Sequence, residues 1–279
     1  MPGSSRVKVI TAPSFAPIVL LRHVLDLREY VDLLYTLSVH RVKVRYKQSI
    51  LGLAWALLQP LLLMLVYTVI FSKFAKVSTG GPPYPVFVYS ALLIWSFFST
   101  ALTNIATGMV SHSQWITKVF FPREILPHSY VFAAIFDLLV ASLTLFGLML
   151  FYRMPLTLNA AYAILVVLVA VIFVTGLGLV LSAAQVRYRD IGLAMPLLLQ
   201  CWMFATPVVY PLIAVPPKYR ALYDLNPMVG VVENFRRVVV EGVAPDYPSL
   251  ARGALVACIL LVLAYLYFKN REATMADII

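Results

Sequence analysis

The chain has 279 residues, of which 62% are hydrophobic and 12% are charged, and its mean hydropathy is +0.89. Soluble domains carry about 25% charged residues, so this composition excludes an ordinary soluble protein and predicts an integral membrane protein. The net charge of +10 does not indicate nucleic-acid binding, because the 22 Lys and Arg residues stand mainly between apolar runs, where such residues set topology and contact lipid headgroups.

The N-terminal part predicts a cytoplasmic tail followed by a helix on the membrane surface. Residues 1–27 contain a short apolar patch that Pro17 interrupts, and no small-residue cleavage site follows it, so a secretory signal is not expected. Residues 28–47 predict an amphipathic interface helix, because an apolar stripe recurs there at helical spacing. The final residues VKVRYK also alternate with a period of 2, so periodicity leaves a strand open there. The apolar stripe consists of Tyr35, Val39, Val42 and Tyr46.

Six transmembrane helices are expected next, so the predicted fold class is an all-α polytopic membrane protein. The stretch from Lys43 to Ser72 sets the pattern, since its basic start leads directly into an uncharged run that exceeds the roughly 20 residues needed to cross a bilayer. Gly176 and Gly178 predict a close helix contact in the fourth span, and Pro207 and Pro211 are expected to break the fifth near its end. The expected spans are about 50–72, 86–110, 129–151, 160–184, 193–214 and 253–268, within a transmembrane domain of 48–271 that precedes a cytoplasmic tail of 272–279.

The distribution of basic residues predicts that both termini are cytoplasmic. With the N-terminus inside, the cytoplasmic segments collect 14 of the 22 Lys and Arg residues, eight of them before the first span. The opposite side holds the other eight, five of which lie in the long segment before the sixth span. Charges in short loops near span ends set topology, so this orientation satisfies the positive-inside rule, and an even number of spans agrees with it.

The predicted cytoplasmic loop 111–129 is more elaborate than a simple connection. It places Trp115, Phe120 and Phe121 beside charged residues, which is typical of aromatic anchors at a membrane interface. A short helix with charges at its tip also suits a docking surface, so both interpretations stay open.

The predicted outer loop 224–242 indicates an interfacial or re-entrant helix between spans five and six. Asn226 can cap this helix, Pro227 fits its first turn and Gly242 its end. The segment is too short and too polar to span the membrane. Its apolar face is Val231, Phe235 and Val238, and its charged residues are Glu233, Arg236 and Arg237.

The sequence carries no catalytic or metal-binding motif, so we expect a protein that is not an enzyme. It lacks the GxxxxGK[ST] loop that cradles phosphates and the HExxH or paired Cys and His spacing of metal sites. Cys201 and Cys258 fall in apolar runs and indicate no disulfide. Asp137 is a carboxylate inside a predicted span, where snorkelling to the interface or a structural hydrogen bond explains it better than a proton relay.

Four segments carry a resemblance to a known family. They are RYKQSILGLAWALLQPLLLMLVYTVIF, KVFFPREILP, VRYRDIG followed by PLLLQCWMFATPVVYP, and YDLNPMVGVVENFR. Together, in this order and spacing, they resemble the membrane subunit of type-2 ATP-binding-cassette (ABC) exporters of polysaccharides, which export O-antigen, capsule or teichoic-acid chains. The resemblance covers about Arg41 to Phe268, which is most of the chain.

The resemblance implies a transporter permease in the bacterial cytoplasmic (inner) membrane, acting as a homodimer with two copies of a separate ABC ATPase subunit. ATP and Mg would bind to that partner, and this chain would hold no cofactor. The implied substrate is a polysaccharide linked to a polyprenyl diphosphate lipid, such as O-antigen in lipopolysaccharide biosynthesis. A teichoic acid or capsule exporter of the same family is the alternative.

The resemblance also implies roles for three groups of residues. Coupling to the ATPase would use residues 111–124, with contacts from Trp115, Lys118, Phe120, Phe121, Pro122, Arg123 and Glu124. Capture of the diphosphate would use the cations Arg41, Lys43, Arg45 and Lys47, although contact with phospholipid headgroups is the simpler explanation of each. An aromatic lining of the glycan path would use Trp55, Tyr67, Phe71, Trp95, Phe97, Phe98, Trp202, Phe204 and Tyr210, with helix packing as the simpler explanation.

Three other classes of membrane protein fit the sequence less well. A secondary transporter would be expected to carry coupling-ion carboxylates near the midplane and repeated halves, and only Asp137 fits. An integral membrane transferase acting on lipid-linked sugars would need acidic or His residues gathered at one face, but the acids here are scattered. A purely structural anchor would not need two elaborated loops.

Overall fold

The structure is a computed structural model that describes residues 27–47, 49–118 and 121–278. Within these residues the chain is helical and forms no strand, so the helical interpretation of VKVRYK is confirmed. Residues 1–26 of the predicted N-terminal tail and Phe120 lie outside the described residues. In chain order the helices are η1 (Leu27–Tyr30), α2 (Val31–Lys47), α3 (Ala54–Tyr67), η2 (Thr68–Phe74), α4 (Tyr84–Ser111), α5 (Ser113–Lys118), α6 (Ile125–Phe151), η3 (Leu158–Tyr162), α7 (Ala163–Arg187), α8 (Asp190–Phe204), η4 (Leu212–Ala214), α9 (Pro217–Asp224), α10 (Pro227–Val239) and α11 (Tyr247–Ile278).

Five helical stretches are long and apolar enough to cross a membrane, so the predicted count of six is confirmed for five. They are Ala54–Phe74, Tyr84–Ser111, Ile125–Phe151, Leu158–Arg187 and Tyr247–Glu272. The expected fifth span, 193–214, instead forms the 15-residue helix α8 followed by turns. Fifteen residues rise about 22 Å, which is less than the roughly 30 Å of a hydrocarbon core.

The backbone after α8 leaves the helix because Pro207 and Pro211 have no N–H to donate. Carbonyl groups freed in this way need other donors inside an apolar bundle. Arg236 of α10 donates from Nη2 to the carbonyl oxygen of Pro207 at 3.0 Å, and the Tyr84 hydroxyl at the start of α4 donates to that of Val209 at 2.7 Å. Tertiary contacts therefore stabilise the break that the prolines cause.

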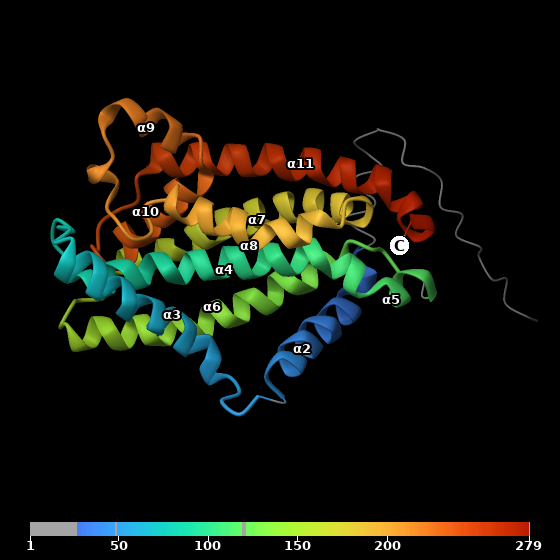
Figure 1. The fold of residues 1–279 in the computed structure, drawn as a ribbon, viewed down its shortest axis with the longest axis horizontal. Coiled ribbons are helices and arrows are strands. Elements are labelled where there is room, and N and C mark those ends of the chain that lie inside the picture. Colours follow the sequence, from blue (N-terminus) through green and yellow to red (C-terminus); the bar gives the residue numbers. More distant parts are fainter. Residues whose placement is uncertain (1–26, 48, 119–120, 279) are drawn as a thin grey trace, which may run out of the picture.

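The long helices run side by side along the molecule, with α4 between α6 on one side and α7 on the other (Figure 1). Residues Val86 to Trp95 of α4 are all buried, so this helix is apolar on every side and forms the centre of the core. Two glycines of α7 bring its neighbours close: a Cβ at Gly176 would lie 3.0 Å from the backbone of Leu261 in α11, and a Cβ at Gly178 would lie 2.7 Å from the Ile105 side chain in α4. The predicted close contact in this span is thus confirmed.

The bundle has two distinct ends, which we call the α5 end and the α9 end. The α5 end holds α5, the start of α6 and the last turns of α11, whereas the α9 end holds α9, α10 and the start of α11 (Figure 1). α11 has 32 residues, reaches from one end to the other and continues through the predicted tail 272–279 to Ile278.

Helix α2 packs against α6, and the stripe predicted from the sequence faces α6 only in part. Tyr35 of that stripe is 70% exposed, and the buried residue of α2 is Leu37, with Leu34 and Arg41 beside it on the same face. The predicted stripe was wrong at Tyr35 and not at Tyr46, whose hydroxyl contacts Asp137 of α6. Polar contacts of Arg41 and Arg45 with α6 determine which face of α2 turns inward.

Candidate functional site

The polypeptide between α4 and α6 forms a compact structure at the α5 end. The C-terminal residue of α4 is followed by His112, whose Nδ1 lies 3.0 Å from the carbonyl oxygen of Gly108, so the neutral ring carries its proton on Nδ1. The His112 ring packs edge-on against Trp115 of α5 with 5.0 Å between ring centroids. Burial lowers the pKa of His112 below its ordinary value. Trp115 remains 38% exposed, so its indole is open to contact from outside the bundle.

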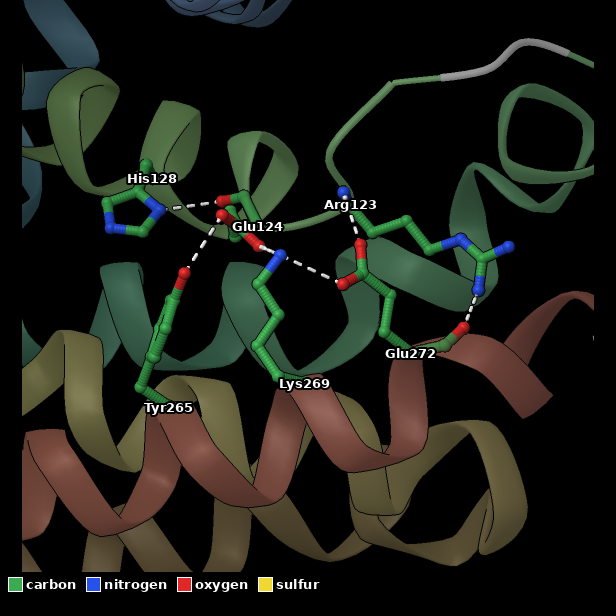
Figure 2. A network of polar contacts seen from close by, with 6 residues as sticks. All are labelled: Arg123, Glu124, His128, Tyr265, Lys269 and Glu272. Carbon is green, nitrogen blue, oxygen red and sulfur yellow. Dashed lines mark hydrogen bonds and ion pairs between the residues drawn. The ribbon is translucent and has the colours of Figure 1, made fainter. Parts of the chain in front are cut away.

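The residues just before α6 are tied to the last turns of α11 by a network of charges (Figure 2). The Glu124 carboxylate forms an ion pair with the Lys269 ammonium, and the Tyr265 hydroxyl donates to Oε1 of Glu124 at 3.2 Å. Lys269 also contacts Oε2 of Glu272 at 2.9 Å. The backbone N–H of Arg123 donates to Oε1 of Glu272 at 3.0 Å, and its guanidinium donates to the Glu272 carbonyl oxygen.

Both central members of this network are removed from solvent. The Glu124 side chain is 1% exposed and the Lys269 side chain 8% exposed. Burial raises the pKa of the Glu124 carboxyl, and the Lys269 ammonium acts in the opposite direction. A buried charge is costly unless it is paired, so each residue requires the other.

The predicted coupling residues are therefore split between surface and interior. Trp115 is exposed, Phe121, Pro122 and Arg123 are half-buried, and Glu124 is buried. For Lys118 only the backbone, at the end of α5, is described. Tyr265, Lys269 and Glu272 were not predicted from the sequence, although their spacing of four and three residues on a helix was a signal that they share one face.

The basic residues of α2 separate into two groups. Lys43 and Lys47 are exposed, whereas Arg41 and Arg45 turn toward α6. Arg41 donates from Nε to the Ser129 hydroxyl at 2.6 Å, and its guanidinium carbon lies 3.4 Å from the centre of the Tyr130 ring. Its Nη2 is buried without a hydrogen-bond partner among the described residues.

Arg45 and Asp137 form an ion pair between α2 and α6. Asp137 lies more than three turns from the start of α6, because this helix begins at Ile125, four residues before the predicted span. The Tyr46 hydroxyl donates to its second oxygen at 2.7 Å, and burial, with Asp137 adding to it, raises the pKa of Tyr46 to about 12. The predicted structural hydrogen bond of Asp137 is therefore present.

A pocket of about 940 Å³ lies next to this ion pair, between α2, α3, α4 and α6. Its wall combines hydroxyl and amide groups of α3 and α4 with aromatic and aliphatic side chains. This combination suits an amphiphile with a hydrogen-bonding headgroup. The polar lining includes Arg45, Tyr46, Gln59, Ser96, Ser99, Thr100, Asn104 and Asp137, and the apolar lining includes Trp55, Leu62, Leu63, Leu93, Phe97 and Leu138.

The nine aromatic residues predicted to line a path occupy different environments. Trp55 and Phe97 line the pocket. Trp95, Phe98 and Trp202 instead form one aromatic cluster with Phe173 of α7, with ring centroids 5.2 to 6.4 Å apart. Tyr67 and Phe71 are half-buried and pack edge to face, Phe204 is 46% exposed, and the Tyr210 hydroxyl lies 2.8 Å from that of Tyr223.

Helix α10 forms where the outer loop predicted a helix. Oδ1 of Asn226 caps it by accepting from the Met228 N–H at 3.1 Å. Arg236, one of the charged residues that make this helix too polar to span a membrane, is 1% exposed. Its guanidinium lies 3.6 Å from the Phe87 ring centre and donates to Glu233 at 2.7 Å. Its burial was not predicted from the sequence, because the fold alone brings its acceptors, the carbonyl oxygens after α8, close to this side chain.

Comparison with known families matches residues 32–240 to the ABC-2 type transporter membrane family. The matched range includes α2 to α10, and therefore contains the segment between α4 and α6, the α2 cations and the pocket. It covers well over half of the chain.

Curated relatives are similar over nearly their whole length. The O-antigen export system permease protein RfbA of Myxococcus xanthus is 32% identical over 260 residues, which is 92% of this chain and 99% of that protein. RfbA of Klebsiella pneumoniae is 26% identical over 249 residues, covering 89% and 95% of the two chains. The polysialic acid transport protein KpsM of Escherichia coli is 25% identical over 247 residues, covering 86% and 93%.

Proposed function

We propose, because this chain belongs to the ABC-2 type transporter family, that it is the membrane subunit of an ATP-driven exporter of a polysaccharide. The observation that carries the proposal is the similarity to the M. xanthus O-antigen permease, at 32% identity over 92% of this chain. O-antigen is the favoured class of cargo, since the capsule-type relative, a polysialic acid transporter, is less similar at 25% identity.

We further propose that the functional assembly holds two copies of this chain and two copies of a separate ABC ATPase in the bacterial cytoplasmic membrane. The α5 end would face the cytoplasm, and both chain termini would be cytoplasmic. Helix α8 and the turns from Ala205 to Pro211 together would make one further crossing, the fifth in chain order, and bring the total to six. Their backbone is supported by Arg236 and Tyr84, as non-helical chain at membrane depth requires.

In this proposal the ATPase docks on the α5 end and moves the segment between α4 and α6. The exposed indole of Trp115 is suited to the centre of such a contact, because aromatic residues dominate protein interfaces. Nucleotide and Mg would stay on the partner, and this chain would contribute the membrane pathway.

The substrate would be a glycan on a polyprenyl diphosphate lipid, taken up beside α2. The buried Nη2 of Arg41 has donor capacity that the described residues leave unused, and a diphosphate is an acceptor that guanidinium groups bind well. Arg45 is already paired with Asp137, so its part in capture would be smaller or would require that pair to open. The neighbouring pocket offers hydroxyl, amide and aromatic groups that fit a sugar.

The decisive experiment is reconstitution of this chain with its ATPase in liposomes. We expect ATP-dependent movement of a polyprenyl diphosphate glycan across the bilayer, and ATPase turnover that rises when this lipid is present. Transport that continues without the ATPase, or with an ATPase unable to hydrolyse ATP, would contradict the proposal. A lipid carrying diphosphate but no glycan separates recognition of the headgroup from recognition of the sugar.

A further inference from the structure

The segment before α6 is attached to α11 through side chains from both elements (Figure 2). Arg123 and Glu124 supply one side, and Tyr265, Lys269 and Glu272 supply the other. We call these five residues the α11 clamp. The three α11 residues are separated by four and three positions, so they share one face of the helix and meet the segment together.

The clamp is built to resist separation. Pulling the segment away from α11 would leave Glu124, at 1% exposure, and Lys269, at 8%, buried without each other. An unpaired buried charge costs much more than a lost surface ion pair. The Arg123 backbone N–H and guanidinium, which both donate to Glu272, would lose their acceptors as well.

Apolar packing continues the attachment around the clamp. Ile125 and Leu126 at the start of α6 belong to one buried cluster with Ala264, Phe268 and Met275 of α11. Phe121 packs against the same cluster. The joint therefore combines charge pairing with burial of apolar surface, and we expect it to move as one body.

Helix α11 continues without interruption from the clamp to the α9 end. Its 32 residues correspond to a length of about 48 Å. It packs along α7, with the Leu261 backbone close to Gly176, and along α10, where a Cβ on Gly230 would lie 3.1 Å from the Ser249 hydroxyl. One helix thus touches the segment before α6 at one end and α10 at the other (Figure 1).

We propose that α11 is a coupling element, and that Lys269 and Glu272 are positioning residues through which movement of the segment between α4 and α6 reaches α10. This inference rests on the proposed function, since it needs an ATPase that moves the segment. Without the clamp, movement would reach α11 only through the apolar packing around it, and would otherwise pass through α4 and α6, which are joined to the segment covalently.

The test uses the complete complex of this chain with its ATPase in lipid nanodiscs. Lys269→Met and Glu124→Gln remove one charge each with little change in size. Lys269→Met, which lies on α11 outside the predicted ATPase contacts, should assemble with the ATPase and keep the basal kcat and the KM for ATP. For Glu124→Gln, which lies in the predicted coupling segment, stimulation is compared with the basal turnover of the same variant. Stimulation of the ATPase by polyprenyl diphosphate glycan should fall about fivefold or more, the scale of a coupling between distant sites. The double variant Lys269→Met and Glu124→Gln should lose no more stimulation than either single variant, because both substitutions break the same ion pair.

Two further variants keep the test decisive. Glu272→Ala removes a less buried member of the clamp, whose side chain is 22% exposed. It tests the role of the clamp if Lys269→Met or Glu124→Gln fails to assemble with the ATPase. Arg252→Gln is the matched control. Arg252 also lies on α11, but at the α9 end, where it forms an exposed ion pair with Asp224 of α9 at 3.5 Å. It should leave stimulation unchanged.

A probe at the other end of α11 checks the relay itself. Glu241→Cys, just after α10, is placed in a chain whose Cys201 and Cys258 are replaced by serine, and its rate of thiol modification is measured with and without ATP. In this parent, ATP should change the rate of thiol modification. In the same chain carrying Lys269→Met, ATP should leave that rate unchanged.

The outcomes separate the two proposals. Full glycan stimulation in Lys269→Met and Glu272→Ala would overturn the role of α11 and leave the exporter intact. The role of α11 would also be overturned if glycan stimulation fell equally in the Arg252→Gln control. The same holds if basal ATPase turnover fell in parallel with stimulation in Lys269→Met, because the clamp would then be merely structural. Absence of stimulation in the unmodified complex would instead refute the exporter proposal.

Discussion

Arg45 of α2 forms an ion pair with Asp137, more than three turns into α6, and the adjacent Tyr46 donates to the same carboxylate at 2.7 Å. A carboxylate at this depth in a membrane helix needs a partner. The partner comes from a helix outside the membrane-spanning set, so α2 is docked onto the bundle rather than resting on lipid alone.

The first prediction concerns the energy of this pair. Arg45→Gln and Asp137→Asn should each lower the thermal unfolding midpoint in nanodiscs, and the two effects should not add in the double variant. The expected coupling is about 1.5–3 kcal/mol, as for hydrogen bonds to charged groups. Lys43→Gln, at an exposed position of the same helix, is the control and should change the midpoint little. Strict additivity would mean that the two residues do not interact in the membrane.

The second prediction concerns substrate capture. Arg41→Ala should weaken the apparent affinity for the polyprenyl diphosphate glycan about tenfold or more, because one charged hydrogen-bonding group is lost. Titration of ATPase stimulation against lipid concentration measures the effect. Lys43→Ala and Lys47→Ala, on the exposed face, should have a smaller effect that high salt removes. Unchanged affinity in Arg41→Ala would remove this residue from the capture site.

The third prediction concerns docking of the ATPase. Trp115→Ala should weaken binding of the purified ATPase about 30-fold, the effect of removing an aromatic residue from the centre of an interface. Tyr219→Ala replaces an aromatic of similar exposure on α9, at the other end of the bundle, and should not affect binding. A loss of binding in both variants would indicate a folding defect rather than a docking site.

The fourth prediction compares two adjacent arginines of α10. Arg236→Met should destabilise the protein by about 3–5 kcal/mol, because it leaves buried acceptors at Glu233 and Pro207 without their donor. Arg237→Met, at an exposed position with one contact to the Ala244 carbonyl oxygen, should cost far less. Chemical unfolding in mixed micelles measures the difference, and equal effects would show that Arg236 is solvated.

The fifth prediction concerns pH. Burial depresses the pKa of His112 in the folded state, so the unfolded state binds the proton first as the pH falls below the ordinary value of about 6.5. The stability that the neutral ring contributes is therefore complete above that value and is lost as the pH falls through the folded pKa. The unfolding midpoint should drop more between pH 7.5 and pH 5.5 in the parent than in His112→Gln. An equal drop in both would mean that His112 is not buried at this junction.

Much of the fold was predictable because the bilayer imposes simple rules on composition. Uncharged runs of sufficient length predicted five membrane helices, and the Asn226, Pro227 pattern predicted α10, since capping is a local property of the chain. The fifth span was overestimated at 193–214, because hydropathy does not register that Pro207 ends the hydrogen-bond ladder before the apolar run ends.

The candidate site was predictable only in part. The segment with Trp115 and Glu124 stood out from its aromatic and charged residues, yet nothing in its own sequence indicated that Glu124 is buried. Lys269 and Glu272 follow a predicted span, where basic residues normally mark topology, so their role in the clamp was hidden.

By itself the sequence determined that this protein resides in a membrane, which five stretches form helices long and apolar enough to cross it, and to which transporter family it belongs, because apolar length, charge placement and the order of similar segments are all properties of the linear chain. Only the tertiary structure decided which charges are paired. Arg45 meets Asp137 and Glu124 meets Lys269 across 92 and 145 positions, and such distant partners are chosen by how helices pack, since a charge inside the bundle is stable only where another helix brings its counterpart within reach.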